Sequence, residues 1–178
     1  LGVGLPRTPD HLNAAVELAA KYRVPVLARG AGSSLAGQAV GEALVLDCSR
    51  YLNKIHKIHD DDQGGDGWVT AEPGAILRDI NHAAAPHGLM IGPDPASADR
   101  ATLGGSLANN ASGAHSIVYG MFADHIGALE TIFGDGQMAT LEETSVSTFE
   151  HSDLQPSTFN AFLKTALNIR ATLAGEIR

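Results

Sequence analysis

Two stretches rich in small residues carry the groups that could bind a ligand. The first, residues 27–38, follows an apolar segment directly and reads Leu-Ala-Arg-Gly-Ala-Gly-Ser-Ser-Leu-Ala-Gly-Gln. Consecutive small residues allow backbone N–H groups to converge on a concave site that binds an anion without a charged side chain. This stretch therefore predicts one of two structures: a backbone site for a phosphate group, or a tight loop between two strands that holds no ligand.

The first stretch matches neither of the two common nucleotide-binding motifs. The dinucleotide fingerprint G-x-G-x-x-G needs a third glycine where this chain has Leu35, and the ten residues 33–42 are too few for a crossover helix. Gly32 and Gly37 have the spacing of a phosphate loop, but Gln38-Ala39 replaces the Lys and Ser/Thr that bind phosphate and magnesium. The Rossmann unit and the P-loop are therefore both excluded.

The second stretch, residues 92–113, predicts a short helix built on glycine. Thr102 is a suitable N-cap, and we expect the first-turn N–H groups around Gly104 and Gly105 to be open to a ligand. Glycine in a helix lowers stability by about 1 kcal/mol relative to alanine. Two adjacent glycines therefore indicate that a ligand or another part of the chain approaches the helix backbone closely. A purely structural reason for the two glycines stays open. Neutral donors suited to a heterocycle or a phosphate follow at Asn109, Asn110 and Ser112.

The elements around these stretches are a mixture of helices and strands. Periodicity, capping residues and turn residues locate them. We predict helices over residues 9–22, 75–85 and 157–177. Thr8 is expected to cap the first helix. The second helix is expected to bury Ile76, Leu77, Ile80 and Ala83. We predict strands before the first helix and over 24–28, 43–47, 55–59, 68–71, 126–133 and 137–141, the last two joined by an Asp135-Gly136 turn.

Composition excludes several classes of protein. Twelve Lys and Arg against twenty Asp and Glu give the 178-residue chain a net charge of −8, which disfavours binding to nucleic acid through a general field. No apolar run approaches the roughly 20 residues of a membrane span. A single cysteine, Cys48, cannot form an internal disulfide, which fits a reducing compartment, and a cytoplasmic location is expected. We expect this thiol to pack beside a strand. The histidine spacings predict no metal site.

The order of several motifs resembles the FAD-linked oxidase family. This is the vanillyl-alcohol-oxidase or PCMH-type FAD-binding domain of glycolate, D-lactate and D-2-hydroxyglutarate dehydrogenases. The likeness covers residues 3–141. The motifs that carry it are residues 25–38, Gly-Pro-Asp-Pro-Ala-Ser at 92–97, Ala-Thr-Leu-Gly-Gly at 101–105, Asn-Asn-Ala-Ser-Gly at 109–113, Tyr-Gly-Met at 119–121, Asp-His-Ile at 124–126 and Gly-Asp-Gly at 134–136.

The resemblance implies an α+β fold of two α/β lobes that hold FAD between them, followed by a C-terminal helix. The FAD-binding domain is expected over residues 1–141, with lobes at about 1–59 and 60–141. Residues 142–178 are expected to form a linker and a helical segment that leads into a substrate domain outside this chain. The residues implied to bind the cofactor are Gly30, Ala31, Gly32, Ser33, Ser34, Pro93, Asp94, Ser97, Thr102, Gly104, Gly105, Asn109, Ser112, Gly113 and Ile126.

The resemblance also implies a function: oxidation of a 2-hydroxy acid by hydride transfer to FAD. Some members attach the flavin covalently through a His or a Cys, but here Ser33 or Ser34 and Ser112 occupy those positions, so non-covalent FAD is expected. His115 and His125 are candidates for positions beside the flavin. The catalytic residues are expected to lie outside this chain. The likeness to long dehydrogenases implies that the intact protein also contains an iron–sulfur module and associates peripherally with a membrane.

Two other hypotheses are weighed against this one. In the first, the chain is a non-catalytic nucleotide-binding or interaction module that keeps the fold without redox chemistry. In the second, the chain folds but cannot retain FAD by itself, because the domain that closes over the cofactor is missing. The sequence identifies no catalytic residue and leaves the choice of hydroxy acid, the electron acceptor and the oligomeric state open.

Overall fold

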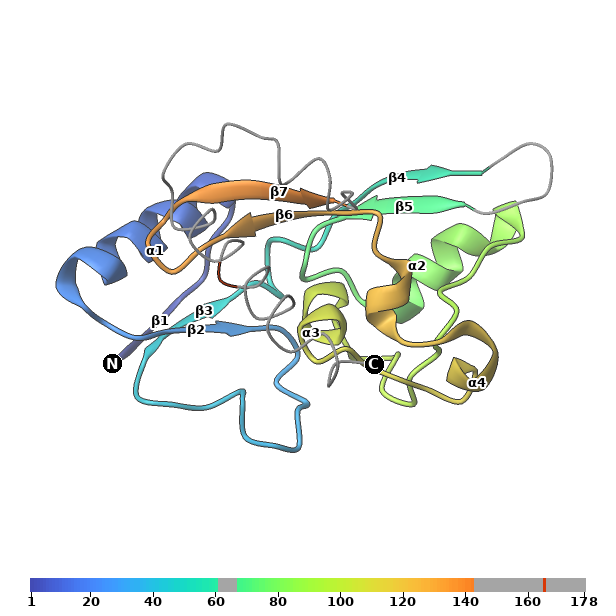
Figure 1. Cartoon of the computed structure of the whole chain (residues 1–178), viewed down its shortest axis with the longest axis horizontal. Coiled ribbons are helices and arrows are strands. Elements are labelled where there is room, and N and C mark those ends of the chain that lie inside the picture. The colour runs from blue at the N-terminus through green and yellow to red at the C-terminus, as the bar shows by residue number, and fades with distance from the viewer. Residues whose placement is uncertain (61–66, 143–164, 166–178) are drawn as a thin grey trace. The chain divides into compact units, whose positions relative to one another are not determined.

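The computed structural model of the chain describes residues 1–60, 67–142 and 165 (Figure 1). The chain divides into two compact units, residues 1–126 and residues 127–178. The predicted helix at 157–177 lies outside the described residues except for Thr165, which is helical. Helix and strand are mixed throughout the described part, as predicted.

The first unit begins with a parallel three-stranded sheet. Its strands are β1 (Gly2–Gly4), β2 (Val26–Arg29) and β3 (Leu44–Asp47), in the order β1-β3-β2. Helix α1 (Pro9–Tyr22) connects β1 to β2, and residues 30–43 connect β2 to β3 without a helix (Figure 1). The structure therefore confirms that the first glycine stretch is not part of a Rossmann unit.

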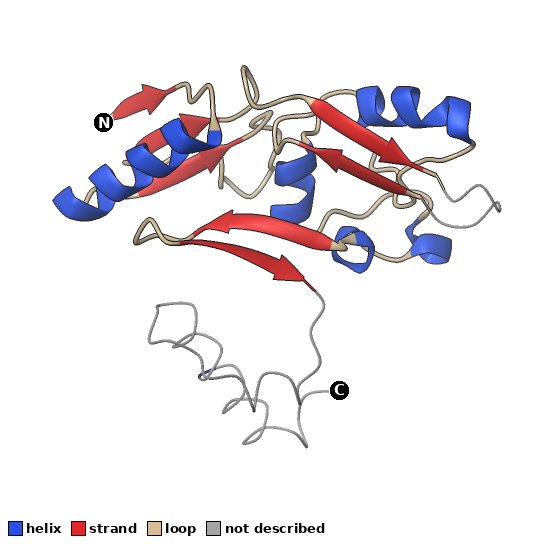
Figure 2. Ribbon diagram, turned by 90° about the horizontal axis from the view of Figure 1, so that it is seen from above, coloured by secondary structure: helices blue, strands red, loops and turns tan. Residues whose placement is uncertain are grey.

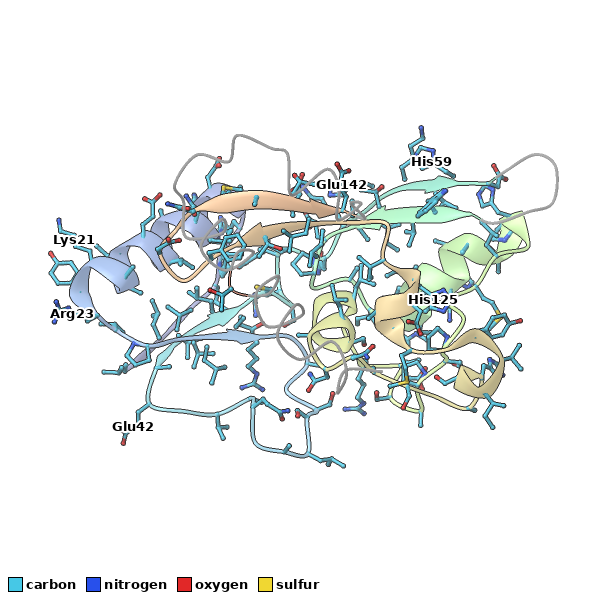
Figure 3. The ribbon with its side chains drawn as sticks, viewed as in Figure 1. Lys21, Arg23, Glu42, His59, His125 and Glu142 are labelled. Atoms are coloured by element: carbon cyan, nitrogen blue, oxygen red, sulfur yellow. The ribbon has the colours of Figure 1, made fainter. Side chains whose placement is uncertain are left out.

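Helix α1 has the boundaries that its sequence predicts. The Thr8 side chain accepts a hydrogen bond of 3.2 Å from the N–H of His11, and Arg23 ends the helix in the left-handed conformation, with φ 54°. Val16 and Ala19 are buried on the predicted apolar face. The side chains of Lys21 and Arg23 lie at the C-terminal end of this helix (Figure 3).

The middle of the first unit is an antiparallel hairpin followed by a helix. Strands β4 (Ile55–His59) and β5 (Trp68–Ala71) pair as predicted, and α2 (Leu77–Ala84) runs into the 3₁₀ turn η1 (Ala85–His87). The helix was expected to start at residue 75, but the N–H of Ala75 donates to the carbonyl of Glu72 in a turn. Its buried positions include residue 84 instead of the predicted residue 83.

Short helices complete the first unit. They are α3 (Leu103–Ala108), α4 (Ser116–Tyr119) and the 3₁₀ turn η2 (Phe122–His125). A hydrophobic cluster of Leu77, Ala101 and Phe122 joins α2, the segment before α3 and η2. The second glycine stretch is therefore anchored to the core through Ala101.

The second unit contains a confirmed hairpin. Strand β6 (Ala128–Ile132) pairs with β7 (Met138–Glu142) in antiparallel register (Figure 2). Asp135 and Gly136 form the turn between them: the Asp135 side chain accepts from the N–H of Gln137 at 3.0 Å, and Gly136 has φ 86°. The lobe boundaries near residues 59 and 141 stay predictions.

Candidate functional site

The first glycine stretch forms an exposed loop at the carboxyl end of β2. The backbone N–H groups of residues 30–34 donate no hydrogen bond to any other described residue. Gly32 has φ +70°, a left-handed conformation that glycine adopts without strain. Ligands of parallel α/β sheets bind at the carboxyl ends of the strands, so these N–H groups are placed where an anion would be bound.

The first loop lies against the second glycine stretch. A Cβ atom on Gly30 would overlap Oγ1 of Thr102, so the two backbones approach as closely as they do because residue 30 is glycine. Further along the loop, Nε2 of Gln38 donates to Oδ1 of Asn109 at 3.1 Å, across 71 positions of sequence. The Ser34 hydroxyl donates to the same glutamine's Oε1. The structure thus brings two stretches that are distant in sequence into one site.

The N-terminal turn of α3 is not open to a ligand, and that expectation is wrong. The N–H of Leu103 donates to the carbonyl of Ala75, and the N–H of Gly104 donates to the carbonyl of Pro73, both at 2.8 Å. A Cβ atom on residue 104 would lie 2.7 Å from Cβ of the same proline. The close approach that this glycine allows is therefore to the protein's own backbone.

Thr102 acts as the cap of α3 and as the contact for the first loop. Its Oγ1 accepts from the N–H of Gly105 at 3.3 Å, and the residue is only 2% exposed. A Cβ atom on Gly105 would lie 2.9 Å from that oxygen. Thr102 therefore supports the first loop at Gly30, and Gly105 leaves room for the capping oxygen.

A second set of free N–H groups lies before α3. The backbone N–H groups of Asp94, Ala96 and Ser97 donate to no other described residue. Asp94 has φ 46°, and a Cβ atom on Gly113 would overlap its carbonyl group. Pro93 is buried below this turn. The structure therefore brings four of the predicted residues into a second cluster.

The polar residues that follow α3 are mostly engaged within the protein. The side chain of Asn109 uses its Oδ1 for Gln38 and its Nδ2 for the carbonyl of Gly105 at 2.9 Å. Oδ1 of Asn110 accepts from the N–H of Ala123 at 2.9 Å. The exposed Ser112 forms no hydrogen bond with another described residue. Of the three predicted donors, Ser112 and Nδ2 of Asn110 stay available.

The remaining candidates lie near η2 and α4. Ile126 ends η2 and is half-buried. His125 lies in the same turn (Figure 3), with Nε2 2.7 Å from the carbonyl oxygen of Tyr119. His115 has Nδ1 3.8 Å from Oδ2 of Asp94. Across residues 1–60 and 67–142, no three His, Cys, Asp or Glu side chains gather as metal ligands would.

Three residues that the site needs were missed by the sequence reasoning. Gln38 bridges the loop to α3, Pro73 receives the N–H of Gly104, and Arg29 packs on Gly32. Gln38 and Arg29 stand inside the first stretch, so their polar character was a usable signal. Nothing in the sequence indicated Pro73, because its carbonyl group contacts α3 only in the folded chain.

Comparison with known proteins identifies the chain's family. The model of the FAD binding domain family matches residues 1–142. The chain belongs to this FAD binding domain family. FAD carries a diphosphate, and the free N–H groups at 30–34 and at residues 94, 96 and 97 are donors of the kind that bind one. The residues of the site therefore fit the cofactor of the family.

This FAD binding domain matches only a part of each of two curated relatives. The chain is 32% identical over 151 residues to the D-2-hydroxyglutarate dehydrogenase of Escherichia coli K12, covering 83% of this chain and 14% of the relative. It is 33% identical over 143 residues to the glycolate oxidase subunit GlcD of the same strain, covering 78% of this chain and 27% of that subunit. The chain therefore spans less than a third of either relative's length.

A solved structure supports the fold. Alkyldihydroxyacetonephosphate synthase matches with a TM-score of 0.64 and 28% identity, over 80% of this chain and 28% of that chain. No helix in the described part of the FAD binding domain is long and apolar enough to cross a membrane.

Proposed function

We propose that this chain is the FAD-binding portion of a flavin-dependent oxidoreductase that oxidises a 2-hydroxy acid. The curated relatives support the reaction class, since they include dehydrogenases of D-2-hydroxyglutarate and D-lactate and a glycolate oxidase subunit. Bound FAD supplies the acceptor for the hydride that leaves the carbon bearing the hydroxyl group. The chain's own residues bind the cofactor and orient it.

The observation that carries this proposal is the meeting of the two glycine stretches. The Gly30–Thr102 contact and the bond between Gln38 and Asn109 hold the loop 30–34 with its backbone N–H groups free. A hydrogen bond to a charged group contributes about 1.5–3 kcal/mol, so a few of these N–H groups suffice to bind a diphosphate. An acidic chain has reason to use backbone donors for this purpose.

The proposal assigns the two clusters of free N–H groups and Ser112 to direct contact with the cofactor. It assigns Thr102, Gly104, Gly105, Asn109 and Gly113 to positioning. We propose that FAD is held without a covalent bond, because Ser33, Ser34 and Ser112 cannot form the links that a His or Cys forms. His115, His125 and the backbone of Ile126 are proposed beside the flavin.

The substrate site and the catalytic residues are proposed to lie outside this chain. The chain spans 14% of one relative and 27% of another, so we propose that a substrate domain and the catalytic groups lie in other parts of the intact protein. For that protein we also propose an iron–sulfur module and a cytoplasmic location, peripheral to a membrane. The choice among the hydroxy acids stays open.

Absorption spectroscopy tests the cofactor assignment. The purified chain is mixed with FAD, separated from free cofactor and scanned for the visible flavin bands. We expect the bands to stay with the protein and to be released on acid precipitation, because the link is non-covalent. Absence of the bands together with unchanged FAD fluorescence on mixing would contradict FAD binding by this chain. Bands that remain with the precipitated protein would contradict the non-covalent link.

Anaerobic reduction of the intact protein separates an oxidoreductase from a non-catalytic nucleotide-binding module. D-2-hydroxyglutarate, D-lactate and glycolate are added in turn to the FAD-loaded protein. We expect one of them to bleach the flavin absorption, since hydride transfer reduces the ring. If dithionite bleaches the flavin but none of the hydroxy acids does, the alternative module is favoured.

A further inference from the structure

Arg29 immediately precedes the first loop in the sequence, and its side chain packs directly on Gly32. A Cβ atom on Gly32 would lie 2.6 Å from Nη2 of Arg29, 2.9 Å from Cζ and 3.0 Å from Nε. All three distances are to the guanidinium group, so this group occupies the space beside Gly32 into which a side chain would extend. The loop therefore rests on a positive charge.

No described carboxylate neutralises this guanidinium group. Arg29 forms no ion pair with another residue of the described part. Asp47 lies opposite it in the β2–β3 register, but Oδ1 of Asp47 accepts from the N–H and the hydroxyl of Ser49, at 2.9 and 2.6 Å. The charge thus stays available in a chain whose net charge is −8.

We propose that Arg29 binds the diphosphate of FAD together with the N–H groups of residues 30–34. This inference rests on the proposed function and adds a charged side chain to a site that the sequence reasoning treated as backbone alone. A planar guanidinium packs on glycine and still presents N–H groups at its edge, which a lysine ammonium does not. The preference for glycine at position 32 follows from its φ of +70°, because the arginine side chain beside it could move aside for a Cβ atom.

Equilibrium binding of FAD and of ADP tests the proposal, with Arg29→Gln as the main variant. Both ligands carry the diphosphate, and ADP isolates it from the flavin ring. We expect Arg29→Gln to raise both dissociation constants by about ten- to hundredfold, as the loss of a charge-assisted hydrogen bond implies. Lys21→Gln removes one charge from the far end of α1 and is expected to leave both constants within about twofold.

Salt dependence and a conservative variant separate a charge that binds from a side chain that only supports the loop. For the wild type, ADP affinity is expected to fall as salt rises, and this fall should be smaller in Arg29→Gln. Arg29→Lys keeps the charge, so its salt dependence should match the wild type while its affinity lies between the two. A circular dichroism melt confirms that each variant is folded.

The outcomes distinguish this inference from the proposed function. If the wild type binds FAD and ADP, and folded Arg29→Gln binds both with the same affinity and salt dependence, the Arg29 inference is overturned and the cofactor assignment stands. If Arg29→Gln and Arg29→Lys weaken binding equally with unchanged salt dependence, Arg29 is a structural support only. If the wild type binds neither ligand, both proposals fail for this chain.

Discussion

Gly30 is the residue at which the two halves of the site touch. A side chain at this position would overlap Thr102, so alanine must push the loop away from α3. We predict that Gly30→Ala lowers the free energy of unfolding by about 1–3 kcal/mol, the usual cost of overpacking, and weakens FAD binding. Urea unfolding and FAD titration measure the two effects.

Gly134 provides the matched control for this substitution. A Cβ atom there would meet nothing within 4 Å, so Gly134→Ala should change the free energy of unfolding by less than about 0.5 kcal/mol. Equal effects of the two substitutions would show that the contact between Gly30 and Thr102 does not determine the stability of the site.

Cys48 is a packed thiol, as the sequence predicted. It is 8% exposed, and its pKa is raised by burial first and by the nearby charge of Asp47 second. A raised pKa keeps the thiol protonated near pH 8, and alkylation requires the thiolate. We predict that iodoacetamide modifies the folded chain at least about tenfold more slowly than the urea-unfolded chain at that pH. Equal rates would contradict the burial of this side chain.

Helix α3 shows how an element can serve a site without touching its ligand. The N–H groups of Leu103, Gly104 and Gly105 are all used within the protein, so this helix offers no anion site at its start. Its capping residue instead supports the loop that carries the free donors. Helix α3 therefore supports the first loop, whereas the free donors of the second glycine stretch lie outside the helix, at residues 94, 96 and 97.

One ion pair connects the end of β4 to η1. Nδ1 of His87 lies 2.6 Å from Oδ2 of Asp60, and this hydrogen bond is the main cause that lowers the pKa of Asp60 below its ordinary value of 3.8. A carboxyl with a lowered pKa in the folded state stabilises the fold above its ordinary pKa and loses that effect as pH falls through the lowered value.

The pair therefore predicts a pH-dependent effect of His87→Gln. The variant should be less stable than the wild type near pH 6, and the difference should shrink as the pH falls below about 4. The Asp60 carboxyl carbon, followed by NMR, should titrate at a higher pH in the variant. His82→Gln is the control, because His82 forms no ion pair within the described residues. An unchanged Asp60 titration in His87→Gln would contradict the pair.

The chain divides into two units after residue 126, and the described hydrophobic core belongs to the first unit. Every buried hydrophobic side chain in the described part falls between Val16 and Phe122. We predict that a chain of residues 1–126 unfolds cooperatively on heating, as seen by circular dichroism, because it contains this core. A gradual, non-cooperative melt would show that the second unit is needed for folding.

The charge of the whole molecule constrains what it binds. A net charge of −8 repels polyanions at long range, so a diphosphate must be bound by short-range donors. The free N–H groups of residues 30–34 and the guanidinium of Arg29 are such donors, gathered at the carboxyl end of one strand.

Local signals determined the parts of the fold that the sequence predicted well. Thr8 and the apolar spacing of 9–22 define α1, and Asp135-Gly136 defines the last hairpin, because caps and turns depend on neighbours within a few residues. The order of the glycine motifs was also enough to predict the FAD-binding family, which the match over residues 1–142 confirms.

Only the tertiary structure decided which glycines face a ligand and which face the protein. Gly32 and Gly104 both lie in stretches of small residues. The N–H of Gly104 donates to the carbonyl of Pro73, whereas the N–H of Gly32 donates to no described residue. The contacts of Gly30 with Thr102 and of Gln38 with Asn109 join residues about 70 positions apart. Pairings over such distances arise from the packing of whole elements, and no local pattern specifies them.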